Sequence, residues 1–392
     1  MTRFRALWVA LGAALAVAAP MSAQSLYASR GLGLPLISTD ARALALGGIG
    51  VGLTGADFSL VDPSAAAGIT VPGVAFSFQS SWADAEEDGV ASDFSGTRFP
   101  FLSLGYPTSF GTVTVAIGTV VDQRWIATST EQIDLDGAGR TGVVTDRFES
   151  DGGISSVRLG LARTLPGGIS LGAQVGRNIG DVSRIFTRSF DSLDVGAPVP
   201  DFTAGGRWSY RGWTAAIGAS ASLGSVLRVG GSYTWSSELD ALPDEGTEGA
   251  EGSFGLPAEL RVGATATLSP ELRIIGGLQS STWSSADEDL SVGGARDILS
   301  WGGGLEWAGA SVLGKPSSLR LGYRAAELPF TTDGATDPTE TAFTGGLGMD
   351  LLTSGEVLLA RLDLALERGL REAGTFEERF WRFSTSVRVS GF

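Results

Sequence analysis

The side chains that could do chemistry in this sequence are almost all arginines and carboxylates. The 392 residues include no histidine and no cysteine, and Lys315 is the single lysine. Without histidine the chain lacks the usual general base of hydrolytic triads and the commonest zinc ligand. A formal net charge of −15 argues against nucleic acid as a partner, since phosphate binding needs clustered positive charge. We therefore expect no enzyme, no metal site and no cofactor.

Arginines recur on the small and polar faces of otherwise apolar segments. The four that we assign to the interior of the fold are Arg228, Arg273, Arg320 and Arg361. The first three lie near short connections between segments, and one hypothesis pairs them with Asp40, Asp57 or Asp62 close to the N-terminus. The alternative is a general network of arginines and acids along the wall of the fold. Either arrangement requires elements that point these side chains inward.

Fourteen segments with a period of two are the elements that can do this. In the third segment Val115, Ile117 and Val121 share one face, and in the eighth Leu260 lies opposite Arg261. Successive side chains of a strand point to opposite faces, so one face is oily and the other is small, polar or arginine-bearing. Such alternation is typical of membrane barrels. The segments are 74–83, 99–107, 111–122, 154–164, 169–185, 206–222, 226–236, 258–268, 271–284, 296–308, 317–327, 340–351, 356–367 and 379–392.

The connections between these segments alternate between short and long, as the inner turns and outer loops of outer-membrane barrels do. The long ones are 84–98, 122–153, 186–205, 237–257, 285–295, 328–339 and 368–378, and they carry many of the acids. Tryptophans gather at the same ends of the segments, where the membrane–water interface favours them. They are Trp82, Trp125, Trp208, Trp235, Trp283 and Trp381. A packed core is the alternative explanation of these rings.

The domain organisation follows from the first residues and from this pattern. Arg3, Arg5, an apolar run over 6–19 and small residues up to Ala23 indicate a secretory signal peptide over residues 1–23. No later apolar run reaches the roughly 20 residues that a membrane-spanning helix needs. Strands cross a bilayer only as a closed barrel. The expected fold is all-β, a 14-stranded antiparallel transmembrane β-barrel over 71–392, with residues 24–70 as an N-terminal hatch inside the lumen.

The glycine-rich stretch 38–69 carries a family resemblance. Its hatch motif consists of Arg42, Gly47, Gly48, Gly50, Asp57, Asp62, Pro63 and Ser64. In this order the motif resembles the N-terminal hatch of FadL-type outer-membrane transporters, and PorV-type barrels of secretion systems have a similar opening. Asp62 stands where that family has asparagine before Pro-Ala. The resemblance implies passive uptake of hydrophobic small molecules, of the long-chain fatty acid or hydrocarbon type, past the hatch.

The same resemblance implies a ligand pocket and a sideways exit through the wall. The candidate ligand-binding residues are Leu44, Leu46, Ile49, Val51, Leu53 and Phe58. Glycines at 302–304 and 345–346 are candidate weak spots for the exit. Two alternatives stay open: a PorV-like scaffold that binds exported proteins, and a general diffusion porin, which needs a lumen free of the hatch. The expected surroundings are the lipid bilayer and lipopolysaccharide of a Gram-negative-type outer membrane. Phe392 resembles the aromatic end that barrel-assembly machinery recognises.

Overall fold

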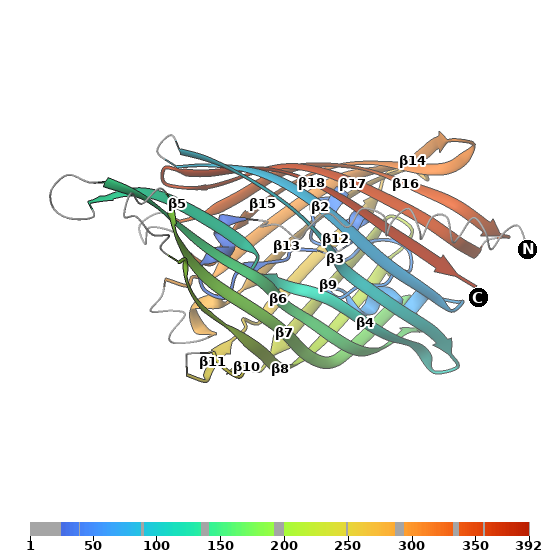
Figure 1. Cartoon of the computed structure of the whole chain (residues 1–392). Coiled ribbons are helices and arrows are strands. Elements are labelled where there is room, and N and C mark those ends of the chain that lie inside the picture. The colour runs from blue at the N-terminus through green and yellow to red at the C-terminus, as the bar shows by residue number, and fades with distance from the viewer. Residues whose placement is uncertain are drawn as a thin grey trace, which may run out of the picture.

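The structure is a computed structural model that describes residues 25–391 apart from 39, 88–89, 135–140, 192–199, 248–249, 287–293, 332–336 and 356. The expected signal peptide and Phe392 lie outside the described residues. None of the helices in the described part is long and apolar enough to cross a membrane. The strands form one antiparallel sheet that closes on itself, because β18 pairs with β2. Figure 1 shows the resulting barrel, with the short turns at one end.

The wall contains fourteen strands once three interrupted ones are joined. β4 and β5 both pair with β6, β9 and β10 both pair with β8, and β11 and β12 continue along β10 and β9. The segments are β2 (Gly73–Glu87), β3 (Val90–Thr108), β4 (Gly111–Asp122), β5 (Trp125–Asp134), β6 (Thr141–Leu165), β7 (Ile169–Asp191), β8 (Phe202–Leu223), β9 (Leu227–Ser236), β10 (Glu238–Pro243), β11 (Gly252–Gly255), β12 (Glu259–Thr267), β13 (Leu272–Ser281), β14 (Ile298–Val312), β15 (Lys315–Glu327), β16 (Thr339–Ser354), β17 (Val357–Ala373) and β18 (Phe376–Ser390). Each predicted segment corresponds to one of these fourteen strands.

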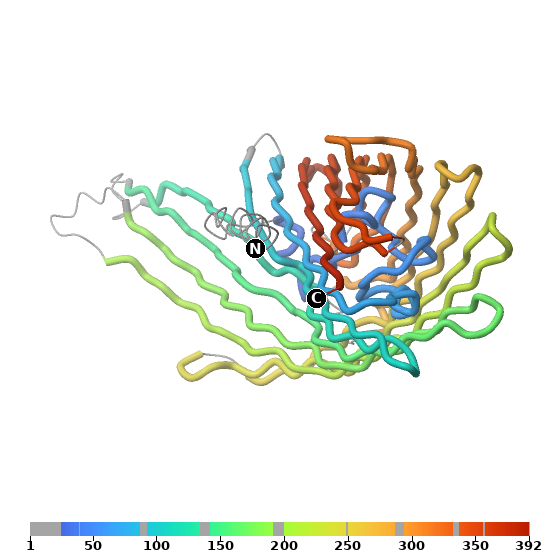
Figure 2. Tube along the Cα trace, turned by 90° about the vertical axis from the view of Figure 1, so that its right-hand side faces the viewer, coloured from blue at the N-terminus to red at the C-terminus, as the bar shows by residue number. Residues whose placement is uncertain are grey.

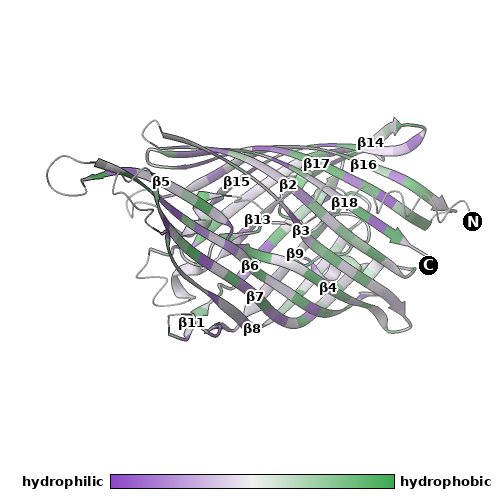
Figure 3. Cartoon of the chain, viewed as in Figure 1, coloured by the Kyte–Doolittle hydropathy of each residue, from purple (hydrophilic) through white to green (hydrophobic). Residues whose placement is uncertain are grey.

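The oily stripes face outward, as the alternation predicts. Leu260 and Ile117 are exposed on the outer surface, whereas Arg261 is buried in the lumen. Figure 3 shows hydrophobic and hydrophilic residues alternating along β3, β4 and β7. One residue breaks the rule: the β4–β6 register shifts between Thr119 and Val121, so Val121 points inward and is buried. The prediction for Val121 was wrong because a bulge changes the face of every later side chain.

Several expected outer loops are in fact strands. The expected loop 122–153 contains β5 and the start of β6, and the loop 237–257 contains β10 and β11. β6 and β7 run for 25 and 23 residues and extend beyond the other strands (Figures 1 and 2). A strand outside the bilayer has water on both faces, so it shows no oily alternation. The alternation pattern therefore does not predict this extension. We call it the outer blade; it consists of β5 and the parts of β6 and β7 that extend beyond the other strands.

The hatch lies inside the barrel, where Figure 2 shows its blue trace within the wall. Its elements are η1 (Leu26–Ser29), β1 (Leu34–Pro35), α2 (Ala41–Ala45) and η2 (Pro63–Gly68). The start of the hatch lies near the outer end, because Leu26 N donates to Glu378 Oε2 beside the β17–β18 hairpin. Its end lies at the short-turn end, because Gly391 N donates to Pro72 O. The hatch therefore runs the length of the lumen.

Five of the six predicted interfacial tryptophans divide into two groups, and Trp125, at the start of β5, is half-buried. Trp82, Trp235 and Trp381 are exposed on the outer surface, as expected for an interfacial belt. Trp283 instead lies in η3 (Trp283–Ser285) and is buried, and Trp208 packs against buried residues of the lumen. The interfacial prediction was wrong for these two rings. The alternative explanation, core packing, applies to them.

Candidate functional site: the hatch and the lumen

Two aspartates shape the hatch by capping its helical turns. Asp40 is the N-cap of α2, and its carboxylate accepts hydrogen bonds from Arg42 N and Ala43 N. Asp62 caps η2 and accepts from Ser64 N at 3.0 Å and from Ser64 Oγ at 2.6 Å. Such caps satisfy backbone donors that a helix start leaves unpaired. Pro63 at the first helical position completes this start.

Burial also changes how these two carboxylates titrate. For Asp40, burial followed by the charges of Asp57 and Asp363 raises the pKa to about 7. For Asp62, burial raises the pKa, and the hydrogen bonds from Ser64 oppose this shift only in part. Among the described residues, neither carboxylate forms an ion pair with an arginine of the wall. They act through the backbone of the hatch instead.

Glycines let the hatch touch the wall. Gly47 has φ +90°, and a Cβ at this position would lie 2.5 Å from the backbone N of Gly303. Gly52 has φ +73°, and its Cβ would lie 2.5 Å from the carbonyl oxygen of Gly263. Only glycine combines this backbone conformation with such close contact. The glycines at 302–304 are thus a contact surface with an unbroken ladder to β13 and β15, and their assignment as a weak spot was wrong.

Among the described residues, one ion pair joins the hatch to the wall. Its arginine belongs to the hatch and its acid to the wall, which is the reverse of our hypothesis. Arg42 of the hatch donates to Glu306 of β14 through Nε at 3.2 Å and Nη2 at 3.3 Å. Glu306 also accepts from Arg273 at 2.8 Å and Arg320 at 2.9 Å. Arg320 donates further to Asp363 at 2.7 Å. We call this group the Glu306 hub.

The proposed pairing of wall arginines with hatch acids was therefore wrong. Arg273 and Arg320 bind acids of the wall, and Arg228 donates to Ser220 and Ser222. Arg361 lies between Asp350 and Asp363, also in the wall. The general network, which the sequence left open, is the arrangement observed. Glu306 was missed, although a lone acid within an apolar membrane segment is a signal for an interior role.

Other wall side chains hold the hatch by its backbone carbonyls. Arg158 Nη1 donates to Leu60 O at 3.1 Å, and Arg261 Nη1 donates to Ile37 O at 2.7 Å. Arg388 Nη1 donates to Ala56 O at 2.5 Å. Gln174, Thr265 and Thr344 make similar bonds. An irregular segment has many unpaired carbonyls, and buried ones need donors.

The expected ligand-binding residues lie at the interface of hatch and wall. Leu44, Leu46, Ile49, Val51 and Phe58 are buried, and Leu53 is half-buried. Leu44 packs with Ala41, Ala45 and Ala365, and Phe58 packs in a separate cluster with Phe101. The structure does not bring the six into one pocket. Their role in ligand binding stays a prediction.

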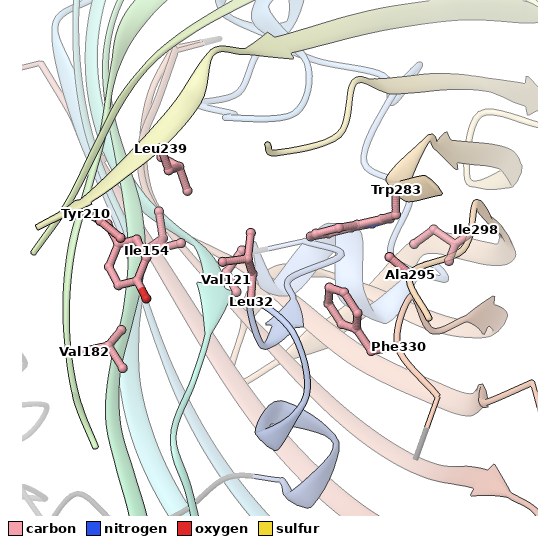
Figure 4. Packing of buried hydrophobic residues seen from close by; sticks show 11 residues of the cluster. Leu32, Val121, Ile154, Val182, Tyr210, Leu239, Trp283, Ala295, Ile298 and Phe330 are labelled. Atoms are coloured by element: carbon pink, nitrogen blue, oxygen red, sulfur yellow. The ribbon is translucent and has the colours of Figure 1, made fainter. Parts of the chain in front are cut away.

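A different set of apolar residues lines the lumen beyond the hatch on the outer side, and we call it the outer apolar cluster. Its members are Leu32, Val121, Ile154, Val182, Tyr210, Leu239, Ala241, Trp283, Ala295, Ile298 and Phe330. Figure 4 shows Tyr210, Ile154 and Val182 on one side and Trp283, Ile298 and Phe330 on the other, with Val121 and Leu32 between them. No sequence pattern indicates this cluster, because its members come from strands, loops and the hatch and lie far apart in the chain.

The wall is incomplete where β3 meets β4. Residues 101–108 of β3 pair with 111–118 of β4, but 90–98 pair only with β2 among the described residues. We call this break the seam. Side chains bridge it: Arg98 donates to Asp122 Oδ2 at 3.0 Å, and Arg124 Nη1 donates to Thr97 O at 2.7 Å. From inside, β1 of the hatch pairs with residues 121–122 of β4.

A large cavity lies at the short-turn end, below the hatch. It has a volume of about 660 Å³ and is lined by both charged and aromatic residues, among them Arg42, Phe58, Phe101, Arg273, Arg361 and Arg388. We call it the vestibule. No cluster of three or more acidic side chains is arranged to hold a metal ion within the described ranges.

Comparison with known proteins identifies the family. A family model described as BamG matches residues 1–199, just over half of the chain. The chain belongs to the BamG family. No curated protein matches this BamG-family chain.

Solved structures show which fold the BamG-family chain has. The toluene transporter TbuX of Ralstonia pickettii matches with a TM-score of 0.58 and 14% identity, covering 91% of this chain and 99% of that one. A FadL homologue of Pseudomonas aeruginosa matches with a TM-score of 0.61 and 13% identity over 91% and 99%. The CymD monoaromatic hydrocarbon channel matches with a TM-score of 0.55 and 14% identity over 92% and 99%. The FadL-type outer-membrane barrel fold is thereby confirmed.

Proposed function

We propose that this BamG-family protein resides in the outer membrane of a Gram-negative-type bacterium and admits hydrophobic small molecules passively past its hatch. The observation that carries this proposal is the outer apolar cluster, which lies inside the lumen and includes residues of the wall and of the hatch. Pockets for small ligands are usually apolar with a few polar groups. The solved structures with the same fold include the toluene transporter TbuX and the monoaromatic hydrocarbon channel CymD. We propose transport rather than catalysis.

The seam is the exit that fits this proposal. Val121 belongs to the outer apolar cluster and also pairs with Pro35 of β1. Displacement of β1 frees the edge of β4 and leaves only the bridge of Arg98, Asp122 and Arg124 between lumen and lipid. A ligand in the cluster thus lies beside the element that must move. A general porin is disfavoured, because hydrogen bonds from several sides fix the hatch in the lumen.

Vesicle transport tests the proposal. The purified protein is reconstituted, and entry of labelled toluene, laurate and the polar solute arabinose is recorded together with ion conductance. We expect entry of toluene or laurate, low conductance and no arabinose flux. Leu239→Asn, which places an amide in the apolar cluster, reduces entry, whereas Leu313→Asn in the exposed β14–β15 turn does not. Steady conductance with arabinose flux means a porin instead.

A second candidate is a subunit role in barrel assembly. The BamG name suggests association with the barrel-assembly machinery. The outer blade favours such a role, because β5 pairs only with β6 among the described residues and offers an unpaired edge. Phe148 and Phe202 are also exposed there. Purification from native membranes in mild detergent distinguishes this role from transport. A stoichiometric complex with other proteins, together with no transport of any probe in vesicles, supports the assembly role.

A further inference from the structure

Two arginines on the outer surface of the barrel stack on tryptophans of neighbouring strands. Arg177 of β7 lies directly opposite Trp213 of β8, with its guanidinium carbon 4.8 Å from the centroid of the tryptophan ring. Arg368 of β17 lies opposite Trp381 of β18 in the same way, at 5.3 Å. All four side chains are exposed. The two pairs come from separate parts of the wall, and we call them the Arg–Trp pairs.

Both arginines lie just inside the outer edge of the oily band. Toward the outer end, the outward faces of β7 and β17 carry the same order of side chains: apolar, arginine, apolar, acid. They are Val175, Arg177, Ile179 and Asp181 in β7, and Leu366, Arg368, Leu370 and Glu372 in β17. The acid marks where the outward face becomes polar, so each arginine is one apolar side chain short of this point. Lipid headgroups begin where the hydrocarbon core of a bilayer ends, and each guanidinium therefore lies at their level.

The wall supplies no anion for these two cations. Within the described part of the chain, neither arginine of the Arg–Trp pairs has a carboxylate within 4.0 Å or a hydrogen bond from its guanidinium. The next arginine toward the outer end differs in this respect on both sides of the barrel. Arg211 lies directly opposite Asp240, and Arg379 lies 2.7 Å from Glu377. A charge on the lipid face is unfavourable, so an anion from outside the chain would stabilise each Arg–Trp pair.

Stacking prepares each guanidinium to bind a phosphate. A guanidinium that lies on an aromatic ring keeps the N–H donors at its edge free, and the ring fixes its plane. Two parallel N–H donors match two oxygens of a phosphate group. An arginine that only extends toward water needs no ring beside it. Tryptophan itself favours the boundary between hydrocarbon and headgroups, which is where lipid phosphates lie.

We propose that the two Arg–Trp pairs bind the phosphate groups of lipopolysaccharide, one lipid molecule at each pair. Both pairs lie toward the long-loop end of their strands, so they face the outer leaflet. In a Gram-negative-type outer membrane this leaflet consists largely of lipopolysaccharide. The exposed side chains of Val175 and Leu366, on the inner side of each arginine, contact the acyl chains. The inference rests on the proposed location in the outer membrane and does not depend on transport.

Native mass spectrometry of the purified full-length protein in detergent counts the bound lipids. The probes are diphosphoryl lipid A, its dephosphorylated form and phosphatidylglycerol. We expect two tightly bound molecules of diphosphoryl lipid A on the wild-type protein, one on Arg177→Gln or Arg368→Gln, and none on the double variant. Each substitution should weaken its own site on the order of 10- to 100-fold, the effect of losing hydrogen bonds to a charged group. Trp381→Leu keeps an apolar side chain and should weaken only the site at Arg368.

The matched control is Arg147→Gln, which removes the same charge from an exposed arginine of the outer blade that pairs with Glu149 at 3.0 Å. We expect it to keep both lipids. Equal losses in Arg147→Gln and Arg368→Gln mean non-specific attraction and overturn the inference.

The wild-type protein tests the inference without any variant. Equally tight binding of dephosphorylated lipid A overturns it, and so does the absence of bound diphosphoryl lipid A. Phosphatidylglycerol that binds as tightly, with the same dependence on the two arginines, refutes lipopolysaccharide as the ligand. Two bound lipids on a protein that transports no probe in vesicles refute the proposed transport and leave this inference intact.

Discussion

Arg42→Met is the most direct perturbation of the closed hatch. Arg42 forms the ion pair that joins the hatch to the wall in the described structure, and its side chain is 10% exposed, against 2% for Glu306. Methionine keeps much of the length of arginine but removes the charge and the hydrogen bond to Thr54 O at 2.9 Å. The change therefore tests whether this contact holds the hatch in place.

The magnitude follows from the surroundings of Glu306. Removing one partner of a buried ion pair typically costs about 3–5 kcal/mol. Glu306 keeps Arg273 and Arg320, which lowers the cost, and the bond to Thr54 lies within the hatch and does not contribute to docking. We expect hatch docking to weaken by about 3 kcal/mol. This corresponds to roughly a 100-fold increase in the population with a displaced hatch, since every 1.4 kcal/mol is tenfold.

Single-channel recording in planar bilayers measures this population as the frequency of openings. Arg273→Met is the matched control, because Arg273 contacts the same carboxylate at 2.8 Å but comes from the wall and is 26% exposed. We expect less than about a tenfold change there, as partly exposed pairs contribute little. Equal opening frequencies for the two variants would falsify the reasoning, because the contact would then stabilise the wall and not the hatch.

Three further outcomes follow from the structure. Asp40→Asn keeps the N-cap and removes the titrating charge. The pKa of Asp40 is raised to about 7, so the folded hatch binds the proton more tightly than the unfolded chain does. Protease protection of the wild-type hatch should therefore rise as pH falls from 8 to 5, and protection of the variant should not change over this range. Gly47→Ala places a Cβ 2.5 Å from the wall backbone and should lower the denaturation midpoint more than Gly55→Ala does. Gly55 also has a positive φ, +89°, but a Cβ there would meet no atom within 4 Å. Equal decreases in the midpoint argue against the contact between Gly47 and the wall. Leu321→Arg on the lipid face should destabilise the barrel by about 2–4 kcal/mol in a detergent or bilayer unfolding assay, whereas Leu313→Arg in a turn should have little effect; similar losses contradict the outward orientation of β15.

The sequence by itself determined the barrel and its fourteen strands, and it predicted a hatch over residues 24–70. The physical reason is local. A strand between lipid and lumen must alternate apolar and polar side chains, and Leu260 next to Arg261 shows this alternation. The positive-φ glycines at 47 and 52 are local signals too, because backbone conformation is a property of one residue and its neighbours.

Only the tertiary structure decided which side chains meet. Three features of the lumen have no periodic signal in the sequence: the partner of Arg42, the inward orientation of Val121 and the burial of Trp283. They depend on the stagger of the strands, on a bulge in β4 and on the path of the hatch. The seam likewise arises from the end of one ladder between β3 and β4. A strand pattern fixes which face a residue takes, but register between distant strands fixes its neighbours. The chemistry of this lumen lies in those neighbours.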